Sequence, residues 1–326
     1  MASVAFPGLA RSHTLSTSHT YGYAYHPPNK SSLPTILFLH GFPSSCYDWR
    51  HQINFFTQEG YGVLAPDLLG YGNTSKPTAL EAYKTKRMAA EILELLDHEG
   101  INKVHAVGHD TGCNLLSRLA NYSPSRLLTV TFLGVPYSKP GEHFDLKAVN
   151  AQTRQFLGCE LFGYLEFFTR SDAGRILDQH SDSFFTLFYP ADPSLWVEHV
   201  GPTRAMEAWL LQDKKGPEPR YVTKTERQIH QAIMRNGHTS ALQWYRALIG
   251  NINEQDELQA ELDPALSMPV LMVRPQPSKL ELPGVEEQMK QVTRDFTFRR
   301  VSTMGHWVQL EAPDEINSTL KEFFER

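Results

Sequence analysis

The chain has 326 residues, of which 41% are hydrophobic and 21% are charged, and its formal net charge at pH 7 is −5. These values are typical of a globular protein with a substantial apolar core, and they exclude a disordered chain. The acidic balance and the lack of a basic run give no reason to expect nucleic acid or an anionic membrane as a partner.

The N-terminal residues 1–11 lack a basic segment followed by a long apolar stretch, so we expect no signal peptide. No apolar run approaches the ~20 residues of a membrane span. Cys46, Cys113 and Cys159 are widely spaced and form no metal-ligand pattern, so we expect neither a metal nor a disulfide. Reduced thiols favour a cytoplasmic location. The sequence leaves the oligomeric state open.

The first part of the chain alternates between strand-like and helix-like stretches. Residues 19–25 alternate like a strand pair. Residues 35–39 and 62–66 are short continuous apolar runs, as expected of buried parallel strands, and a glycine-bearing loop follows each run. Residues 47–56 and 82–98 have helical spacing. This order of elements predicts a mostly parallel central sheet with helices on both of its faces.

The second part begins with a strand, a sharp turn and a helix. We expect a buried strand from Val104, a turn over 108–112 and a helix from Asn114, followed by a strand over 128–133. Residues 137–250 are mostly helical in pattern and rich in aromatic residues. We interpret them as a helical cap inserted into a core.

The core therefore comprises residues 1–136 and 251–326. In its second part we expect a strand over 269–273 and an amphipathic stretch over 285–292. A last strand over 296–301 and a closing helix over 314–324 complete the core.

The turn Gly108-His-Asp-Thr-Gly112 has the spacing of a nucleophile elbow, with Asp110 at the central position. The glycines allow a tight bend that lifts the central side chain above the sheet. A carboxylate in this position can displace a leaving group at a saturated carbon and form an ester on the enzyme. A plain loop that contains Asp between two glycines is the alternative.

Two further loops carry chemistry that fits this elbow. His306 follows the last predicted strand, where the base that activates water is expected in this chain order. His40-Gly-Phe-Pro43 follows a buried strand and should lie at the same carboxyl edge of the sheet. The backbone amides of Phe42 and Thr111 could then stabilise the oxyanion that forms when water attacks the Asp110 ester.

These motifs resemble the α/β-hydrolase fold, and within it the epoxide hydrolases related to the soluble mammalian and plant enzymes. The resemblance is carried by residues 40–50, 67–77 and 108–112, and it extends from about residue 21 to residue 324. It implies an inserted helical cap that supplies two tyrosines, which hold and protonate the epoxide oxygen. The matching positions are Tyr164, in Phe-Gly-Tyr-Leu-Glu, and Tyr245, in Leu-Gln-Trp-Tyr-Arg.

The resemblance also implies substrate contacts, no cofactor, and water as the co-substrate. We assign the substrate contacts to His40, Pro43, His109 and Trp307. The aromatic residues of the cap suggest an apolar pocket between cap and core, and they include Phe184, Phe185, Phe188 and Trp196.

The sequence departs from the family pattern at two positions. Thr111 follows the nucleophile where the family carries Trp, so an aromatic wall and an indole donor are lost. The family also has an acid behind the catalytic His, and the corresponding position here falls near Ser278. Glu281 is the nearest carboxylate and could replace that acid. Without an acid, hydrolysis of the ester should be slow, while attack by Asp110 should be unaffected.

The sequence predicts an epoxide hydrolase that acts on a small, apolar or partly apolar epoxide and water to give a vicinal diol. A haloalkane or haloacid dehalogenase could use the same Asp110 and His306, although the loss of the indole donor counts against it. A cyclase that opens epoxides without water, or a ligand-binding protein on this fold, is a third possibility, which the missing acid keeps open.

Overall fold

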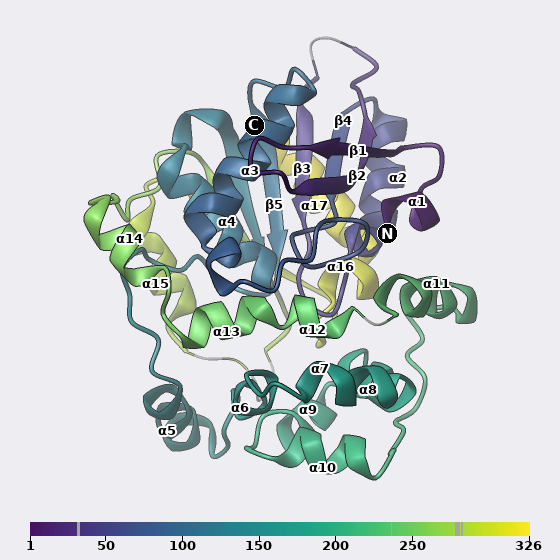
Figure 1. Ribbon diagram of the computed structural model, residues 1–326. Coiled ribbons are helices and arrows are strands. Elements are labelled where there is room, and N and C mark those ends of the chain that lie inside the picture. The colour runs from purple at the N-terminus through teal and green to yellow at the C-terminus, as the bar shows by residue number, and fades with distance from the viewer. Residues whose placement is uncertain (31–32, 236, 278–280, 282) are drawn as a thin grey trace.

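The computed structural model describes residues 1–30, 33–235, 237–277, 281 and 283–326, and it contains a single eight-stranded sheet within them (Figure 1). The strand order is β1-β2-β4-β3-β5-β6-β7-β8. The strands are β1 (Ala10–Thr14), β2 (Thr20–His26), β3 (Thr35–Leu39), β4 (Gly62–Pro66), β5 (Val104–His109), β6 (Leu127–Leu133), β7 (Val270–Pro275) and β8 (Phe296–Val301). β1 and β2 are antiparallel to their neighbours, and the strands from β4 to β8 are parallel.

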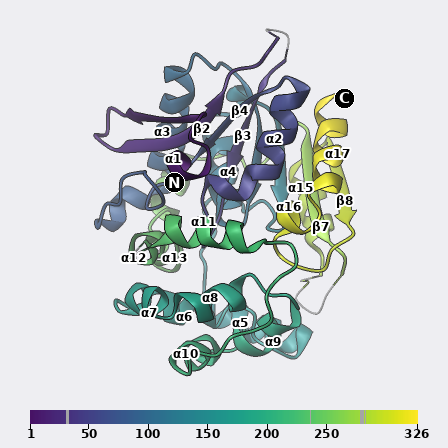
Figure 2. The ribbon, with the colours of Figure 1, turned by 90° about the vertical axis from the view of Figure 1, so that its right-hand side faces the viewer.

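Helices cover both faces of this sheet. One face packs against α3 (Thr85–His98) and α4 (Thr111–Tyr122), and the other face packs against α2 (Arg50–Glu59) and α17 (Pro313–Phe324), as Figure 2 shows from the side. In β3, Leu37 and Leu39 belong to the first core, whereas Ile36 and Phe38 belong to the second. The strand is therefore buried on both faces, which explains its continuous apolar run. The predicted α/β-hydrolase fold is confirmed.

A group of helices lies between β6 and β7 in the sequence. All but the last of them, α14, lie below the sheet in Figures 1 and 2, and α14 lies beside the sheet in Figure 1. They are α5 (Leu146–Leu157), α6 (Tyr164–Phe168), α7 (Ala173–Gln179), α8 (Ser181–Phe188), α9 (Ser194–His199), α10 (Ala205–Leu211), α11 (Lys224–Met234), α12 (His238–Ala241), α13 (Gln243–Ile249) and α14 (Glu254–Gln259). The remaining helices are α1 (Ala2–Ala5), α15 (Val285–Val292) and α16 (Val308–Glu311), with short 3₁₀ turns at Cys46–Trp49, Leu80–Tyr83 and Pro124–Arg126. We refer to residues 137–250 as the cap.

Three sequence predictions are corrected by the structure. The predicted strand pair over 19–25 is the single strand β2, whose antiparallel partner is β1. β1 is an edge strand with the polar sequence Ala-Arg-Ser-His-Thr, so it carries no alternation that would identify it. The helix predicted from residue 82 begins at Thr85, and the helix predicted from Asn114 begins at Thr111, directly after the elbow.

The described residues give no sign of a disulfide, a membrane-spanning helix or a metal site. Cys46, Cys113 and Cys159 are all unpaired. Within the described part of the chain, no helix has the length and apolar character needed to cross a bilayer. In the same residues, no cluster of three or more His, Cys, Asp or Glu side chains is arranged to hold a metal ion.

Candidate active site

Asp110 lies in a sharp turn between β5 and α4, and its backbone has φ 52° and ψ −126°. This conformation is unusual for a residue with a side chain, and such conformations are concentrated at functional sites. The turn is crowded by the loop after β3. A Cβ atom on Gly41 would overlap the Asp110 side chain, and one on Gly112 would overlap the carbonyl oxygen of Leu39. Glycine is therefore required at both positions to bring the two loops together.

The Asp110 carboxylate is held from one side and open on the other. The Phe42 amide donates a hydrogen bond to Oδ1 at 2.9 Å, and the Phe42–Pro43 peptide bond is cis. Burial raises the pKa of Asp110, while His109 and the backbone amides of Phe42 and Thr111 act in the opposite direction. The amides of Phe42 and Thr111, predicted to bind the oxyanion, both donate to the Asp110 carboxylate in this structure.

His306 faces the other oxygen of this carboxylate. Its Nε2 lies 3.6 Å from Asp110 Oδ2, and its ring packs against Trp196 at a centroid distance of 5.0 Å. Burial lowers the pKa of His306 to about 4. The imidazole is therefore neutral at pH 7 and can accept a proton. Among the described residues, Asp110 is the only carboxylate within 4.0 Å of its ring nitrogens.

The loop that carries His306 is held by a buried carboxylate from α16. Glu311 accepts hydrogen bonds from the amides of Gly305 at 3.2 Å and Trp307 at 3.0 Å, and from the hydroxyl of Thr303. Burial raises the pKa of Glu311, and these three donors oppose the shift. Sequence reasoning missed this residue because a single Glu at the end of the short helix α16 carries no distinguishing pattern.

His109 links the elbow to the same loop. Its Nε2 donates to the backbone oxygen of His306 at 3.0 Å, while Nδ1 accepts from the Gln309 amide at 3.2 Å. Only the tautomer with the proton on Nε2 satisfies both bonds. Burial lowers the pKa of His109 to about 3, so this neutral form persists.

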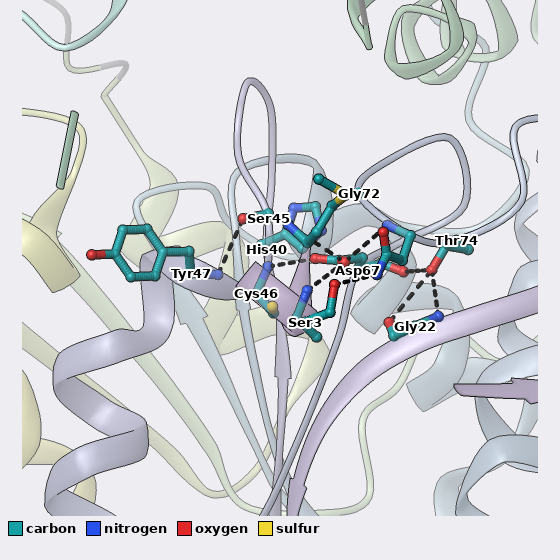
Figure 3. A network of polar contacts seen from close by, with 12 residues as sticks. Ser3, Gly22, His40, Ser45, Cys46, Tyr47, Asp67, Gly72 and Thr74 are labelled. Carbon is teal, nitrogen blue, oxygen red and sulfur yellow. Dashed lines mark hydrogen bonds and ion pairs between the residues drawn. The ribbon is translucent and has the colours of Figure 1, made fainter. Parts of the chain in front are cut away.

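A network around Asp67 fixes the loop that carries Phe42, as Figure 3 shows. Asp67 follows β4 and accepts a hydrogen bond from the Cys46 amide at 3.2 Å. This bond joins the loop after β4 to the loop after β3. The neighbouring His40 accepts from the Leu68 amide through Nε2 at 3.0 Å and donates through Nδ1 to the Gly41 oxygen at 2.8 Å. These contacts set the position of the Phe42 amide.

A cavity of about 280 Å³ lies between the strand ends and the cap, and Asp110 and His306 line it together with Tyr164 and Tyr245. The centroids of the two tyrosine rings are 6.3 Å apart. Burial raises the pKa of both phenols, and the Asp110 charge raises them further. Both phenols therefore remain protonated at neutral pH, as proton donors must.

The cavity wall also contains apolar and polar side chains from several elements. Its other lining residues are Phe42, Gly134, Val135, Pro136, Leu161, Phe162, Phe188, Pro190, Pro193, Trp196, Val200, Gly201, Arg274, Pro275, Gln276, Glu281, Val285, Met304 and Gly305. Of the four aromatic residues expected in an apolar pocket, Phe188 and Trp196 line this cavity. Phe184 and Phe185 line a second cavity instead.

The four residues assigned to substrate contact do not line this cavity. His40 and His109 are buried behind the two loops, with the hydrogen bonds given above. Pro43 lines the second cavity, and its carbonyl oxygen accepts from a cap tyrosine. Trp307 is fully buried, and its indole donates to the Phe188 oxygen at 2.7 Å. These contacts hold the surrounding loops in place.

Glu281 also lines the cavity, but its contacts are with arginines. Its Oε1 pairs with Arg300 at 2.7 Å and lies 3.7 Å from Arg274. Ser278, where the family acid was expected, lies outside the described residues. Thr111 is buried and does not line the cavity, so the indole that the family carries at this position has no counterpart there.

Comparison with known proteins agrees with this geometry. Residues 34–313 match the family described as "alpha/beta hydrolase fold". The chain is 28% identical to "Epoxide hydrolase A" of Mycobacterium tuberculosis, over 89% of this chain and 90% of that protein. It is 30% identical to "Epoxide hydrolase 2" of Siraitia grosvenorii, over 71% of each. The crystal structure of epoxide hydrolase A from Mycobacterium thermoresistibile superposes with a TM-score of 0.77 at 27% identity, covering 96% of this chain and 97% of that one.

Proposed function

The chain belongs to the epoxide hydrolases of the α/β hydrolase fold, and from this membership we propose that it converts an apolar or partly apolar epoxide to a vicinal diol. One observation carries the proposal. A single cavity is lined by the elbow carboxylate Asp110, the imidazole of His306 and the two cap phenols of Tyr164 and Tyr245. Opening an epoxide needs a nucleophile and a proton donor on opposite sides of one carbon–oxygen bond, and this set of groups supplies both.

In the first half-reaction the phenols of Tyr164 and Tyr245 donate hydrogen bonds to the epoxide oxygen. The Asp110 carboxylate attacks one ring carbon, and the bond between that carbon and the ring oxygen breaks. The electron pair stays on the oxygen, which takes a proton from one of the two phenols. The product is a hydroxyalkyl ester of Asp110.

In the second half-reaction neutral His306 takes a proton from water, and the resulting hydroxide attacks the carbonyl carbon of the Asp110 ester. The negative charge that develops on the ester oxygen is stabilised by the amides of Phe42 and Thr111. Collapse of this intermediate breaks the bond to the alkyl group's oxygen, which takes the proton from His306. Asp110 is left as a carboxylic acid, which returns a proton to the phenolate formed in the first half-reaction. The diol leaves, and Asp110 is a carboxylate again.

In this proposal the buried residues around the site act by positioning. His109 and Glu311 hold the His306 loop, while His40 holds the loop of the Phe42 amide. The indole of Trp307 and the carbonyl of Pro43 tie the core to the cap. The substrate meets Phe188 and Trp196 instead, with the cap phenols above Asp110.

An epoxide panel with diol detection, run in ¹⁸O-water at an excess of enzyme over substrate, tests the proposed function. We expect a diol from at least one epoxide. Because each enzyme molecule turns over at most once under these conditions, the label should be found on Asp110 and not in the diol. Halide release from a chloroalkane without any diol would instead support a dehalogenase. A cyclised product without label, or binding without turnover, would support a non-hydrolytic protein on this fold.

Loss of the cap phenols should slow epoxide opening. Replacing Tyr245 or Tyr164 with Phe should lower kcat/KM about tenfold, because the second phenol still donates to the oxygen. The double variant should lose about 10²- to 10³-fold, the range for general acid catalysis. The measurement is steady-state diol formation. Tyr221→Phe is the matched control, because Tyr221 donates to Pro190 and does not line the cavity; an equal loss in the control would contradict the assignment.

The rate of ester hydrolysis should stay constant to unusually low pH. His306 acts as a base only when neutral, and burial lowers its pKa to about 4. The rate should therefore fall only as the pH approaches that value, whereas a histidine with the ordinary pKa of about 6.5 would lose about thirtyfold by pH 5. Rapid-quench mass spectrometry of the Asp110 ester across pH measures this decay. A midpoint near pH 6.5 would contradict the prediction.

A further inference from the structure

The end of helix α8 in the cap contacts both loops that carry the hydrolytic groups. The phenol of Tyr189, directly after this helix, donates a hydrogen bond to the Pro43 carbonyl oxygen at 2.8 Å. Its ring stacks on the Trp307 indole, with the ring centroids 4.2 Å apart and the planes inclined by 12°. Tyr189 is 2% exposed, so both contacts lie in the protein interior. One cap side chain therefore contacts the loop after β3 and the loop after β8 together.

These contacts are made one residue away from two groups of the proposed mechanism. Pro43 follows Phe42, whose amide stabilises the oxyanion in that mechanism. Trp307 follows His306, and its indole N–H donates to the carbonyl oxygen of Phe188 at 2.7 Å. A shift of this part of the cap would therefore move the oxyanion donor and the base relative to each other.

The phenol of Tyr189 is a hydrogen-bond donor at neutral pH. Burial raises its pKa well above the usual value, and the charge of Asp48 raises it further. Asp48 Oδ2 lies 3.4 Å from the hydroxyl, whereas the Pro43 oxygen lies 2.8 Å from it, so the Pro43 carbonyl is the main acceptor. Replacing Tyr189 with Phe removes this bond and leaves the ring in place.

The groups that open the epoxide are not packed against this tyrosine. Among the residues that the structure describes, the aromatic rings that pack against Tyr189 are those of Phe185, His230 and Trp307. Neither of the two cap phenols that line the active-site cavity is among them. Attack on the epoxide by Asp110 should therefore tolerate a change at Tyr189.

We infer that Tyr189 is a positioning residue for hydrolysis of the Asp110 ester. In that step His306 directs water at the carbonyl carbon while the Phe42 amide stabilises the charge on the carbonyl oxygen. Both groups must be in place at the same moment, and a displacement of either by about 1 Å can cost about 10²-fold in rate. The inference rests on the proposed epoxide hydrolase function, and it gives the cap a part in both half-reactions.

The test measures the two half-reactions separately in Tyr189→Phe and Tyr189→Leu. Saturating enzyme is mixed with styrene oxide, or with an epoxide of the panel that reacts faster, and rapid-quench mass spectrometry follows formation and decay of the Asp110 ester. Tyr189→Phe keeps the stack on Trp307 and loses the hydroxyl, so decay should slow about 3- to 10-fold. Tyr189→Leu loses both contacts, so decay should slow about 10- to 100-fold. Ester formation should stay within about twofold of the wild type in both variants.

Tyr221→Phe is the matched control, because it removes a bond of the same kind, from a cap phenol to the Pro190 carbonyl oxygen at 3.2 Å. Its formation and decay rates should stay near those of the wild type. Both are first-order rate constants of the folded enzyme, so partial unfolding of a variant does not alter them. The inference is overturned if decay does not slow more than formation in Tyr189→Leu, or if the control slows decay equally. If Tyr189→Leu does not fold, Tyr189→Phe decides.

Hydrogen exchange in the enzyme without substrate separates failure of the inference from failure of the proposed function. Tyr189→Leu should increase exchange of the backbone amides in residues 40–46 and in residues 303–310 together, while Tyr221→Phe should change neither. If the wild type forms no ester from any epoxide, the proposed function fails, and this joint increase still supports the positioning of both loops by Tyr189. Exchange that increases in only one loop, or in neither, overturns the inference.

Discussion

Replacement of Asp110 with Ala is expected to abolish diol formation, with kcat/KM falling by about 10⁵-fold or more. The substitution removes the atom that bonds to the substrate carbon, and no other described carboxylate except Glu281 lines the cavity. Glu281 is itself held by Arg300 and is not next to His306. Binding should survive, because the phenols and the apolar wall remain in place. Steady-state diol formation and the dissociation constant of an unreactive amide measure the two effects.

The matched control for this substitution is Asp97→Ala. Asp97 is an exposed carboxylate in the last turn of α3 that pairs with Arg126, and its loss should leave turnover unchanged. Both variants should unfold near the wild-type temperature, because Ala keeps the Cβ atom at the elbow and the loss of the buried Asp110 carboxylate removes its desolvation cost together with its hydrogen bond from Phe42. Substantial diol formation by Asp110→Ala, beyond the uncatalysed rate, would rule out a covalent mechanism through this residue.

Replacement of His306 with Gln is expected to stop the cycle after its first half. Asp110 can still attack the epoxide, because that step needs no base. The ester then accumulates, since no group takes the proton from water. We expect a fall in kcat of about 10³- to 10⁴-fold, together with a single stoichiometric burst of epoxide consumption. Intact-protein mass spectrometry should find one substrate mass added, and digestion should locate it on the peptide that contains Asp110.

The behaviour of the wild type in the same experiment bears on the missing acid. Loss of the acid of a related triad costs about 10⁴ in rate. The sequence allowed either Glu281 as a replacement acid or slow ester hydrolysis without an acid. The contacts of Glu281 with Arg300 and Arg274 support the second alternative. Some ester should then be present in the wild type during turnover. If the wild type accumulates no ester and Glu281→Gln behaves like the wild type, then Glu281 is not a replacement acid and ester hydrolysis is not slow, so both alternatives are wrong.

Much of the fold could be predicted from the sequence because the sheet is buried on both faces. The strands over 35–39 and 62–66 were predicted with their observed bounds, since continuous apolar runs identify parallel strands. The strand over 296–301 agrees as well, and the amphipathic stretch over 285–292 forms the helix α15. β1 could not be predicted, because a polar edge strand is stabilised by its pairing with β2 and not by its own pattern.

The candidate site was predictable where a residue's role follows from local spacing. Asp110 sits in a five-residue motif whose glycines are required by packing, so its place in the turn between β5 and α4 could be predicted from the motif. Glu311, by contrast, acts through amides that only the folded loop brings within reach. The ion pair between Glu281, in the loop after β7, and Arg300, on β8, likewise forms only in the folded chain. Sequence patterns record neither kind of long-range contact.

The two oxygens of the Asp110 carboxylate have different contacts, and this difference makes them chemically distinct. The Phe42 amide holds Oδ1, whereas Oδ2 faces His306. In the proposed mechanism Oδ2 is then the atom given up to the diol, and the atom that replaces it comes from water. Unless the carboxylate rotates against the Phe42 amide, every diol carries the water oxygen captured one turnover earlier. Each diol would thus contain an oxygen atom that entered Asp110 from water in the preceding turnover, whereas Oδ1 would remain on the protein through all turnovers.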